Sequence, residues 1–423
     1  MSIINVPYGD TERSFEITDR NLLAVFDYPR VGRPTAAAER AAVDRALENP
    51  IGAASLGELA RGAKRVALLV DDWTRPTPAY KVLPVILEQL REAGCADSDV
   101  SIVFAKGMHR ELSREEMERK VGRDVVERFE PRNHDPHGNL AELGKSPSGT
   151  PVFINRTVVE ADLRIAVGSV LAHPVAGFGG GAKIIVPGVA GHDTIHHNHS
   201  LCNHPSVTIG RAEDNPVRRD MEDIARMADL NMVVNTILSP QLEIVDAVAG
   251  DVVAAHREGV ARYCSIYGAE IAEQADVGVV GASPRDATFG HATFALYAGA
   301  AMVRPGGSLV LVAPCQDGPG SKEGRLEFRE QAANTPEKLM ERIKAGEISA
   351  SGGAFMYVYS RTVNNYRVVL VSDNYSAEEA DELGVGYGVT LQDAVDTALA
   401  SAGADARVSV MPSGGMAVPM AVA

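Results

Sequence analysis

The sequence has few cysteines and no pattern that would use them together. Only four of the 423 residues are cysteine, and no two of them form a CxxC pair. They lie far apart in the chain, at Cys95, Cys202, Cys264 and Cys315. This spacing indicates neither a disulfide framework nor a zinc ribbon. An internal repeat and a low-complexity tract are absent too, so the sequence is typical of an ordinary globular chain.

Long apolar stretches are also absent. No apolar run approaches the roughly 18 residues of a membrane-spanning helix, and residues 1–10 lack the basic and apolar regions of a signal peptide. Acidic residues outnumber basic ones, with 56 Asp and Glu and 41 Lys and Arg, so the net charge is −15. This balance argues against nucleic acid and an anionic membrane surface as partners. Together these features predict a cytoplasmic protein.

Expected strands and helices alternate along the chain. Short apolar runs typical of buried parallel strands alternate with stretches of helical spacing, and a capping box at Ser113–Glu116 opens a helix. The expected strands are 64–71, 100–105, 163–167, 275–280, 309–312, 366–371 and 407–411, and the expected helices include 78–91, 249–263 and 391–399. We also expect a short buried strand at 184–186, ended by Pro187 and Gly188. The small, apolar residues 413–423 are expected to be poorly ordered or lightly packed.

This alternation predicts the α/β class with mostly parallel sheets. A chain of 423 residues is long for a single core, so two domains are expected. The pattern restarts between residues 265 and 275. We therefore predict two Rossmann-like α/β domains, over 1–265 and 275–412, with a ligand site in the cleft between them.

The most informative stretch is residues 173–199, HPVAGFGGGAKIIVPGVAGHDTIHHNH. Six of the eleven histidines lie between residues 173 and 204, and Lys183 sits within a glycine run. Glycines allow close approach to a ligand, lysine is the usual amine nucleophile, and imidazole serves as metal ligand or acid–base group. The run is not a Walker A loop, because Ala182 precedes the lysine and Ile184 follows it. A chance histidine-rich surface loop is disfavoured by the apolar residues 184–190.

Two further motifs are expected at the same place. Asp71–Pro78 reads DDWTRPTP, and Gly107–Arg110 reads GMHR. Asp72, His109 and His173 each follow the end of an expected strand. In a parallel sheet those ends meet at one edge, where ligands bind. The three motifs are therefore predicted to converge on one site.

In their order and spacing, these motifs resemble the nickel-dependent lactate racemase family. The matching elements are HPxAGxGGGxK, VPGVAG and DTIxxNH within residues 173–199, together with the two upstream motifs. The resemblance covers essentially the full length. It implies an isomerase that racemises or epimerises a 2-hydroxy acid at C2, with a cofactor-binding N-terminal domain and a substrate-side C-terminal domain. It leaves open whether the chain is a monomer or a homodimer.

The resemblance also implies the cofactor, a nickel pincer nucleotide (pyridinium-3,5-bisthiocarboxylic acid mononucleotide with nickel) made by dedicated synthesis enzymes. By motif position, Lys183 is its covalent attachment point and His199 its protein nickel ligand. A square-planar geometry with N, S and C donors suits nickel(II). The glycines that let the backbone approach the cofactor are Gly179, Gly180 and Gly181. His196 and His197 lie off the ligand position, so a solvated or hydrogen-bonded role is expected for them.

Chemistry suggests how such a site works. The C2 proton of a 2-hydroxy acid is very weakly acidic, whereas removal as hydride gives a keto acid and requires only a base for the hydroxyl proton. His109 and His173 are candidate bases for the two faces. Asp72 and Arg75 match family active-site positions, and Arg75 offers a fork for a carboxylate or phosphate. Two threonines either donate to phosphate oxygens or serve the turn before Pro78. They are Thr74 and Thr77.

The substrate side departs from the family. Lactate racemases carry a Tyr-Gln-x-x-Lys motif after a strand of the second domain, and our alignment places Phe289, Gly290 and Thr293 at those positions. The missing hydroxyl, amide and cation predict a substrate other than lactate. Arg285 and His291 are candidates to restore polar contacts. Further candidates for the same wall are Gly353, Phe355, Tyr357 and Tyr359.

Two other classes of function remain open from the residues alone. A zinc-dependent hydrolase would use His173, His196 and His199, but the sequence lacks HExxH and a marked general base. A non-catalytic binder would keep the fold without needing a cofactor attachment point such as Lys183.

Overall fold

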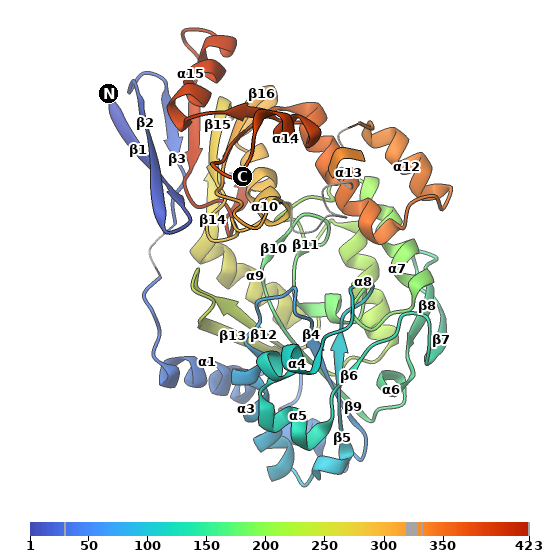
Figure 1. Ribbon diagram of the computed structural model, residues 1–423. Helices are drawn as coiled ribbons and strands as arrows, with labels where there is room; N and C mark the ends of the chain where they lie inside the picture. The colour runs from blue at the N-terminus through green and yellow to red at the C-terminus, as the bar shows by residue number, and fades with distance from the viewer. Residues whose placement is uncertain (29–30, 319–327, 331–332, 422–423) are drawn as a thin grey trace.

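In the computed structural model, which describes residues 1–28, 31–318, 328–330 and 333–421, two six-stranded sheets form the centres of two α/β domains (Figure 1). The first sheet has the order β13-β12-β9-β4-β5-β6. Its strands are β4 Val66–Asp71, β5 Val100–Ala105, β6 Arg132–Asn133, β9 Leu163–Ser169, β12 Met232–Leu238 and β13 Ile244–Gly250. All neighbours are parallel except β12 and β13. The central strands are buried on both faces, as their apolar runs predict.

The second sheet is entirely parallel, in the order β18-β17-β16-β15-β19-β3. Its strands are β3 Leu22–Val25, β15 Ala275–Gly281, β16 Val303–Val312, β17 Arg367–Val371, β18 Gly386–Gly388 and β19 Val408–Met411. The predicted fold class is confirmed.

Helices connect and cover both sheets. Around the first sheet they are α1 Ala36–Glu48, α2 Leu56–Ala60, α3 Ala79–Glu92, α4 Arg114–Val121, α5 Arg123–Phe129, α6 Arg156–Val159, α7 His192–His199, α8 Pro216–Met227 and α9 Ala254–Tyr267. Around the second they are α10 Phe289–Ala300, α12 Pro336–Lys344, α13 Ala350–Asn365, α14 Ala377–Glu382 and α15 Leu391–Ala402. The capping box at Ser113 and Glu116 is present at the start of α4. Within the described residues, no helix is long and apolar enough to cross a membrane.

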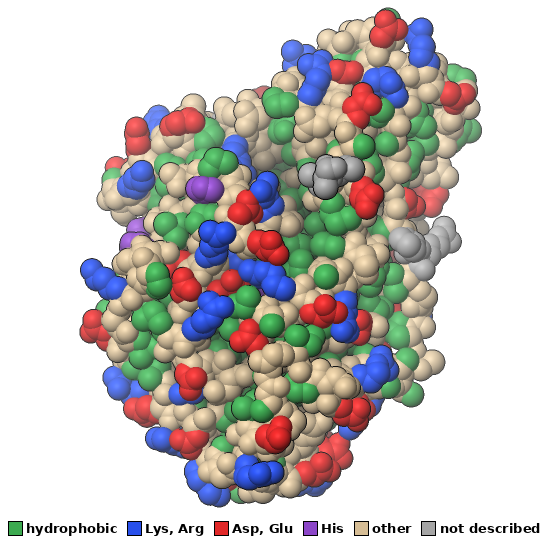
Figure 2. Space-filling view, turned by 180° about the vertical axis from the view of Figure 1, so that it is seen from behind, with side chains coloured by type: hydrophobic (Ala, Val, Ile, Leu, Met, Phe, Trp, Pro, Cys, Tyr) green, Lys and Arg blue, Asp and Glu red, His purple; other side chains and the backbone are tan. Residues whose placement is uncertain are grey.

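Among the described residues there are also four two-stranded sheets and three 3-10 turns. The paired strands are β1 Ser2–Tyr8 with β2 Thr11–Ile17, β7 Leu140–Lys145 with β8 Pro151–Asn155, β10 Ala172–His173 with β11 Gly177–Phe178, and β14 Gly268–Ile271 with β20 Val418–Ala421. The 3-10 turns are Asp97–Asp99, Gly181–Ile184 and Ser200–Asn203. On the face shown in Figure 2, acidic and basic side chains are interspersed rather than gathered in a patch of one sign.

The N-terminal segment lies with the second sheet rather than the first. β3 pairs with β19, and the β1–β2 hairpin packs its buried side chains against the same sheet, where Phe15 joins a cluster with Val277 and Val310. Figure 1 shows these blue strands beside the red and yellow strands of the C-terminal domain. The expected first unit, 1–265, therefore differs from the strand pairing over residues 2–25.

Three local expectations were wrong. Residues 184–186 form no strand, because Ile185 and Val186 donate to the Ala182 carbonyl and so continue a tight turn whose side chains are buried. The helix expected from residue 249 begins at Ala254, since Ala249 pairs within β13. Residues 416–421 are ordered, because β20 pairs with β14 and Met416 to Val418 are buried, while residues 422–423 lie outside the described residues.

Candidate active site

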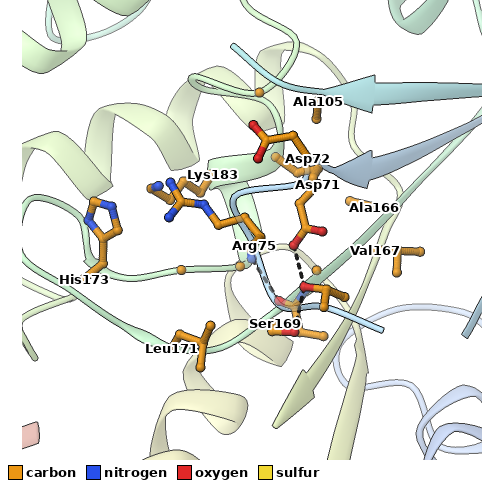
Figure 3. Close-up of a pocket in the computed structure, with 18 of the residues that line it drawn as sticks. Asp71, Asp72, Arg75, Ala105, Ala166, Val167, Ser169, Leu171, His173 and Lys183 are labelled. Atoms are coloured by element: carbon orange, nitrogen blue, oxygen red, sulfur yellow. Dashed lines mark hydrogen bonds between the residues drawn. The ribbon is translucent and has the colours of Figure 1, made fainter. Parts of the chain in front are cut away.

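A pocket lies where β4, β5 and β9 end, and residues of the second domain line one side. The lining residues are Asp71, Asp72, Arg75, Thr77, Ala105, Lys106, His109, Ala166, Val167, Gly168, Ser169, Leu171, Ala172, His173, Gly179, Gly180, Gly181, Lys183, Ile184, Pro187, Gly188, Asn235, Arg285 and Phe294. Figure 3 shows the Arg75 guanidinium extending toward Lys183, with His173 beyond. The predicted convergence of the three motifs in a cleft between two domains is therefore observed.

Asp72 and His109 form a hydrogen-bonded pair. His109 Nδ1 lies 2.5 Å from Asp72 Oδ2, and Asp72 Oδ1 accepts from the backbone and hydroxyl of Thr74. Burial raises the pKa of Asp72, but the hydrogen bond and charge of His109, together with Arg75 and Thr74, outweigh burial, and the pKa is lowered to about 2. A carboxylate beside Nδ1 keeps the proton on that atom. His109 Nε2 is therefore the atom with a free lone pair.

His173 is oriented in the opposite sense. Its Nδ1 accepts hydrogen bonds from the amides of Val175 (3.2 Å) and Ala176 (3.1 Å), while its buried Nε2 has no hydrogen-bond partner among the described residues. A neutral imidazole that accepts at Nδ1 carries its proton on Nε2. His173 thus presents an N–H group, which differs from the expectation of a second base.

Lys183 lies in a positive environment. Burial, followed by the charges of Arg75 and Arg218, lowers the pKa of its amine well below the ordinary value. Within the described part of the chain, its Nζ makes no hydrogen bond or ion pair. An uncharged amine is a nucleophile, whereas an ammonium group is not.

The glycine loop before Lys183 is held by three residues that the sequence patterns did not reveal. Arg218 is fully buried and donates to the carbonyls of residues 176, 178 and 180. His256 Nε2 donates to the residue 179 carbonyl, and Asn235 Oδ1 accepts from the residue 181 amide. Because their partners are backbone groups, which every residue type provides, these three residues produce no recognisable sequence motif.

Side chains at two of these glycines would collide with the supports. A Cβ at Gly181 would lie 2.8 Å from the His256 ring, and one at Gly180 would lie 2.9 Å from Asn235 Oδ1. Both glycines also have positive φ, 71° at Gly180 and 56° at Gly181. The loop can therefore follow this path only with glycine at both positions.

Both threonines of the DDWTRPTP motif donate hydrogen bonds to aspartate carboxylates. Thr77 is buried, donates to Asp71 Oδ2 and contacts the Ser169 hydroxyl at 2.7 Å. Thr74 donates to Asp72 and is absent from the pocket lining. Neither hydroxyl proton is free for a phosphate, so the structure supports the turn role. Asp71 itself is paired with Lys120 at 2.6 Å.

His199 is buried and is absent from the pocket lining. Its Nδ1 has no hydrogen-bond partner within the described residues. Burial, the largest cause, lowers its pKa to about 3, so the ring is neutral. The neighbours are engaged elsewhere, since His196 Nδ1 accepts from the Ala350 amide and His197 Nδ1 contacts Thr150. No three histidine, cysteine or acidic side chains among the described residues could hold a metal together, so the three-histidine zinc site is not formed.

The second domain contributes Arg285 and Phe294. Phe294 lines the pocket and stands edge-on to His173, with ring centroids 6.1 Å apart, and Phe355 does the same at 5.3 Å. The Arg285 guanidinium lies over the Phe294 ring, 4.7 Å from its centroid. This wall is aromatic around His173 and cationic beside it.

Several residues expected in this wall lie elsewhere. Phe289 is buried among other aromatic rings, and the Thr293 hydroxyl donates to a carbonyl of its own helix. Successive residues of a helix point about 100° apart, and Phe294 is the one that reaches the pocket. With a shift of one residue, Gly290, His291 and Phe294 keep the spacing of the Tyr-Gln-x-x-Lys motif. Of the four residues expected from α13, only Phe355 contacts His173, while Gly353 packs on Ile343, Tyr359 is buried in the second domain and Tyr357 lies near Arg361.

Comparison with known proteins agrees with this geometry. Residues 8–210 match the family model of the lactate racemase N-terminal domain, and residues 271–419 match that of the lactate racemase C-terminal domain. The chain belongs to the lactate racemase family. It is therefore an isomerase of the racemase type, and a non-catalytic binder is not supported.

Named relatives span the whole chain. It is 31% identical to the lactate racemase of Thermoanaerobacterium thermosaccharolyticum, over 98% of each chain, and 31% identical to that of Lactiplantibacillus plantarum, over 98% of this chain and 99% of the relative. The solved structure of the T. thermosaccharolyticum lactate racemase apoprotein superposes with a TM-score of 0.89 at 30% identity, covering 99% of this chain and all of that one. A protein from Thermotoga maritima shares the fold, with a TM-score of 0.64 at 18% identity over 93% of this chain and all of its own.

Proposed function

We propose that this racemase inverts C2 of a 2-hydroxy acid with a nickel pincer nucleotide bound covalently to Lys183 and ligated by His199. The observation that supports this most is a lysine amine in the pocket that has no hydrogen-bond or ion-pair partner among the described residues, near a buried, neutral histidine whose Nδ1 also has no partner there. The lysine follows a glycine loop that excludes side chains. When bound, the nucleotide supplies an acceptor for the C2 hydrogen with its electron pair.

The residues present fit such a group. The neutral form of a lysine amine is the one that can attack an acyl group and become acylated. A neutral imidazole nitrogen is the form that binds a metal. Gly180 and Gly181 line the pocket without side chains, so a ligand can approach the backbone there. Arg75, at the same edge, offers an anion-binding fork for either the cofactor or the substrate.

The protons are handled by the two histidines. His109 Nε2 takes the substrate hydroxyl proton, because Asp72 holds the other ring nitrogen and stabilises the imidazolium that results. His173 Nε2–H donates a hydrogen bond to a substrate oxygen from the opposite wall. The aromatic rings around His173 exclude water from that side.

The substrate proposed here is larger than lactate. Phe294 and Phe355 provide an apolar wall, and Gly290 lacks the bulk of a tyrosine or glutamine side chain. A 2-hydroxy acid with an aromatic or longer apolar side chain gains contact area on this wall, whereas the methyl group of lactate does not.

The experiment uses protein co-expressed with the cofactor-synthesis enzymes. Intact-mass measurement is expected to show a covalent adduct that Lys183→Ala abolishes, and metal analysis is expected to show nickel that His199→Ala loses. Racemisation of lactate, 2-hydroxybutyrate, phenyllactate, malate and a sugar acid is then compared. We expect phenyllactate or 2-hydroxybutyrate to exceed lactate by at least about tenfold in kcat/KM. Full activity of Lys183→Ala would exclude the covalent cofactor, and lactate as the best substrate would exclude the proposed wall.

A further inference from the structure

Arg285 is held firmly at the end of β15. Its amide donates to the Ala282 carbonyl at 2.9 Å. The following residue, Asp286, is fixed on both sides, because its side chain accepts from the Gly9 amide and its carbonyl from the Cys315 amide. The neighbouring carboxylate thus faces the N-terminal hairpin. It does not neutralise the arginine.

The Arg285 guanidinium has no counter-ion in the described structure. No ion pair or side-chain hydrogen bond joins it to any described residue, although it lines the pocket. Burial lowers its pKa, and the charge of Arg75 lowers it further. Arg285 is partly buried, and a guanidinium that loses water without gaining a partner is costly, so such groups normally pair with an anion. The pocket therefore favours an anionic ligand on its second-domain side.

The position of the guanidinium suits a carboxylate. It lies over the Phe294 ring, 4.7 Å from the centroid, and no described residue accepts from its N–H groups. A planar guanidinium held by a cation–π contact can bind a carboxylate with two parallel hydrogen bonds. Phe294 also touches His173, so this fork stands next to the group proposed to bind a substrate oxygen.

We propose that Arg285 binds the C1 carboxylate of the substrate and is the cation that replaces the lysine of the Tyr-Gln-x-x-Lys motif. This rests on the proposed function. C1 is favoured over a carboxylate at the far end of a side chain because C1 is bonded to the reacting carbon. Arg285 and His173 both contact the Phe294 ring, so the fork lies close to the reacting groups. The side chain then lies on the aromatic wall. Arg285 thereby makes the substrate bridge the two domains.

The test compares the loaded wild type with Arg285→Met, Arg285→Lys and a control, Arg304→Met, which removes an exposed second-domain arginine paired with Asp276. Kinetics are measured with phenyllactate, with malate and with the uncharged amide of phenyllactate. Binding of the same three compounds is measured by calorimetry. Adduct mass, nickel content and thermal unfolding confirm that each variant is loaded and folded.

Arg285→Met is expected to raise KM and Kd for phenyllactate by roughly 30-fold or more, with a smaller change in kcat. Binding of the amide should change little, so the preference for the charged acid is lost. Arg285→Lys should lie between the two, and Arg304→Met should match the wild type. Guanidinium added to Arg285→Met should partly restore affinity.

Three results would overturn the proposal. The first is an unchanged preference for the acid over the amide in Arg285→Met. The second is a loss confined to malate, which would assign Arg285 to a distal carboxylate. The third is failure of the loaded wild type to bind any of the acids. If the wild type binds phenyllactate through Arg285 but does not racemise it, the proposed function fails while the assignment of Arg285 stands.

Discussion

At the scale of single residues, the two imidazoles of the pocket differ in which nitrogen they offer. His109 is anchored through Nδ1 to a carboxylate, while His173 is anchored through Nδ1 to two amides. The carboxylate anchor leaves the Nε2 lone pair of His109 open to accept a proton, whereas the two amides occupy the only lone pair of the neutral His173 ring. Local hydrogen bonds thus assign different roles to chemically identical side chains.

Glutamine variants separate these roles. Glutamine can donate an N–H but cannot take up a proton. We expect His109→Gln to lose racemisation by roughly 100- to 10,000-fold, the usual effect of removing a general base, while His173→Gln keeps more activity than His173→Ala. Initial rates on both enantiomers measure this. Equal activities of His173→Gln and His173→Ala would contradict the donor role.

Buried histidines also set the acid limit of stability. His134 donates to the Ala190 carbonyl and accepts from Asn155, and burial lowers its pKa to about 4. Because the unfolded chain binds this proton near pH 6.5, the stabilisation is complete above pH 6.5 and is lost as pH falls toward 4. We expect His134 to account for about 2 kcal/mol of lost stability at pH 5.

Urea unfolding at pH 5 and pH 8 measures this loss. His134→Gln should be less stable than the wild type at pH 8, yet should lose about 2 kcal/mol less between the two values. Parallel pH dependences of the two proteins would rule out this contribution.

The sequence predicted which residues lie in the pocket where a motif follows a strand. Asp72, His109 and Lys183 lie in the pocket because strand ends converge at one sheet edge. The prediction did not work for Arg218 and His256, whose partners are carbonyls of any residue type. It also missed Phe294 by one position, since a helix turns by about 100° per residue.

At the scale of elements, the glycine loop depends on α8. Three of its carbonyls are satisfied by one guanidinium, that of Arg218, whose pKa burial lowers to about 10. A loop of glycines has little side-chain packing of its own. Its conformation is thus imposed by a helix that contacts it from behind.

We expect Arg218→Met to reduce the free energy of unfolding by about 3 kcal/mol or more, because three buried carbonyls lose their donor. Arg218→Lys should not rescue it, since one ammonium group cannot reach all three. Adduct formation on Lys183 should fall in both variants. Arg226→Met, on the exposed end of the same helix, is the control. Urea unfolding measures the free energy of unfolding, and intact mass measures the adduct. If Arg218→Met were as stable as the wild type, the loop would not depend on Arg218.

Periodicity located the central strands well and their neighbours less well. Strands such as β4 and β9 are continuous apolar runs bounded by polar residues, which is a clear signal. β3 is a short edge strand whose partner lies near the other end of the chain, so no local pattern marks it. Residues 184–186 are as apolar as a strand, but tertiary packing buries them as a turn.

At the scale of the whole molecule, the second domain is completed by the start of the chain. Deletion of residues 1–25 removes the edge strand beside β19 and uncovers Val277 and Val310. We expect faster hydrogen exchange in peptides covering β15, β16 and β19, with β4 and β9 still protected.

Phe104→Ala provides the reverse control, because Phe104 is fully buried in the core of the first domain. It should loosen the strands of the first sheet before those of the second. If deletion of residues 1–25 instead lowered protection in the first sheet, the N-terminal strands would be stabilising the first domain, which would contradict this prediction.

The pairing of β3 with β19 also orders events during synthesis. The ribosome releases residues 22–25 long before residues 408–411 exist, so β3 has no strand to join until those residues have been made. The first sheet, whose strands lie between residues 66 and 250, can form while translation continues. During that interval the N-terminal hairpin carries an exposed apolar face, which makes the nascent chain a natural client for chaperones.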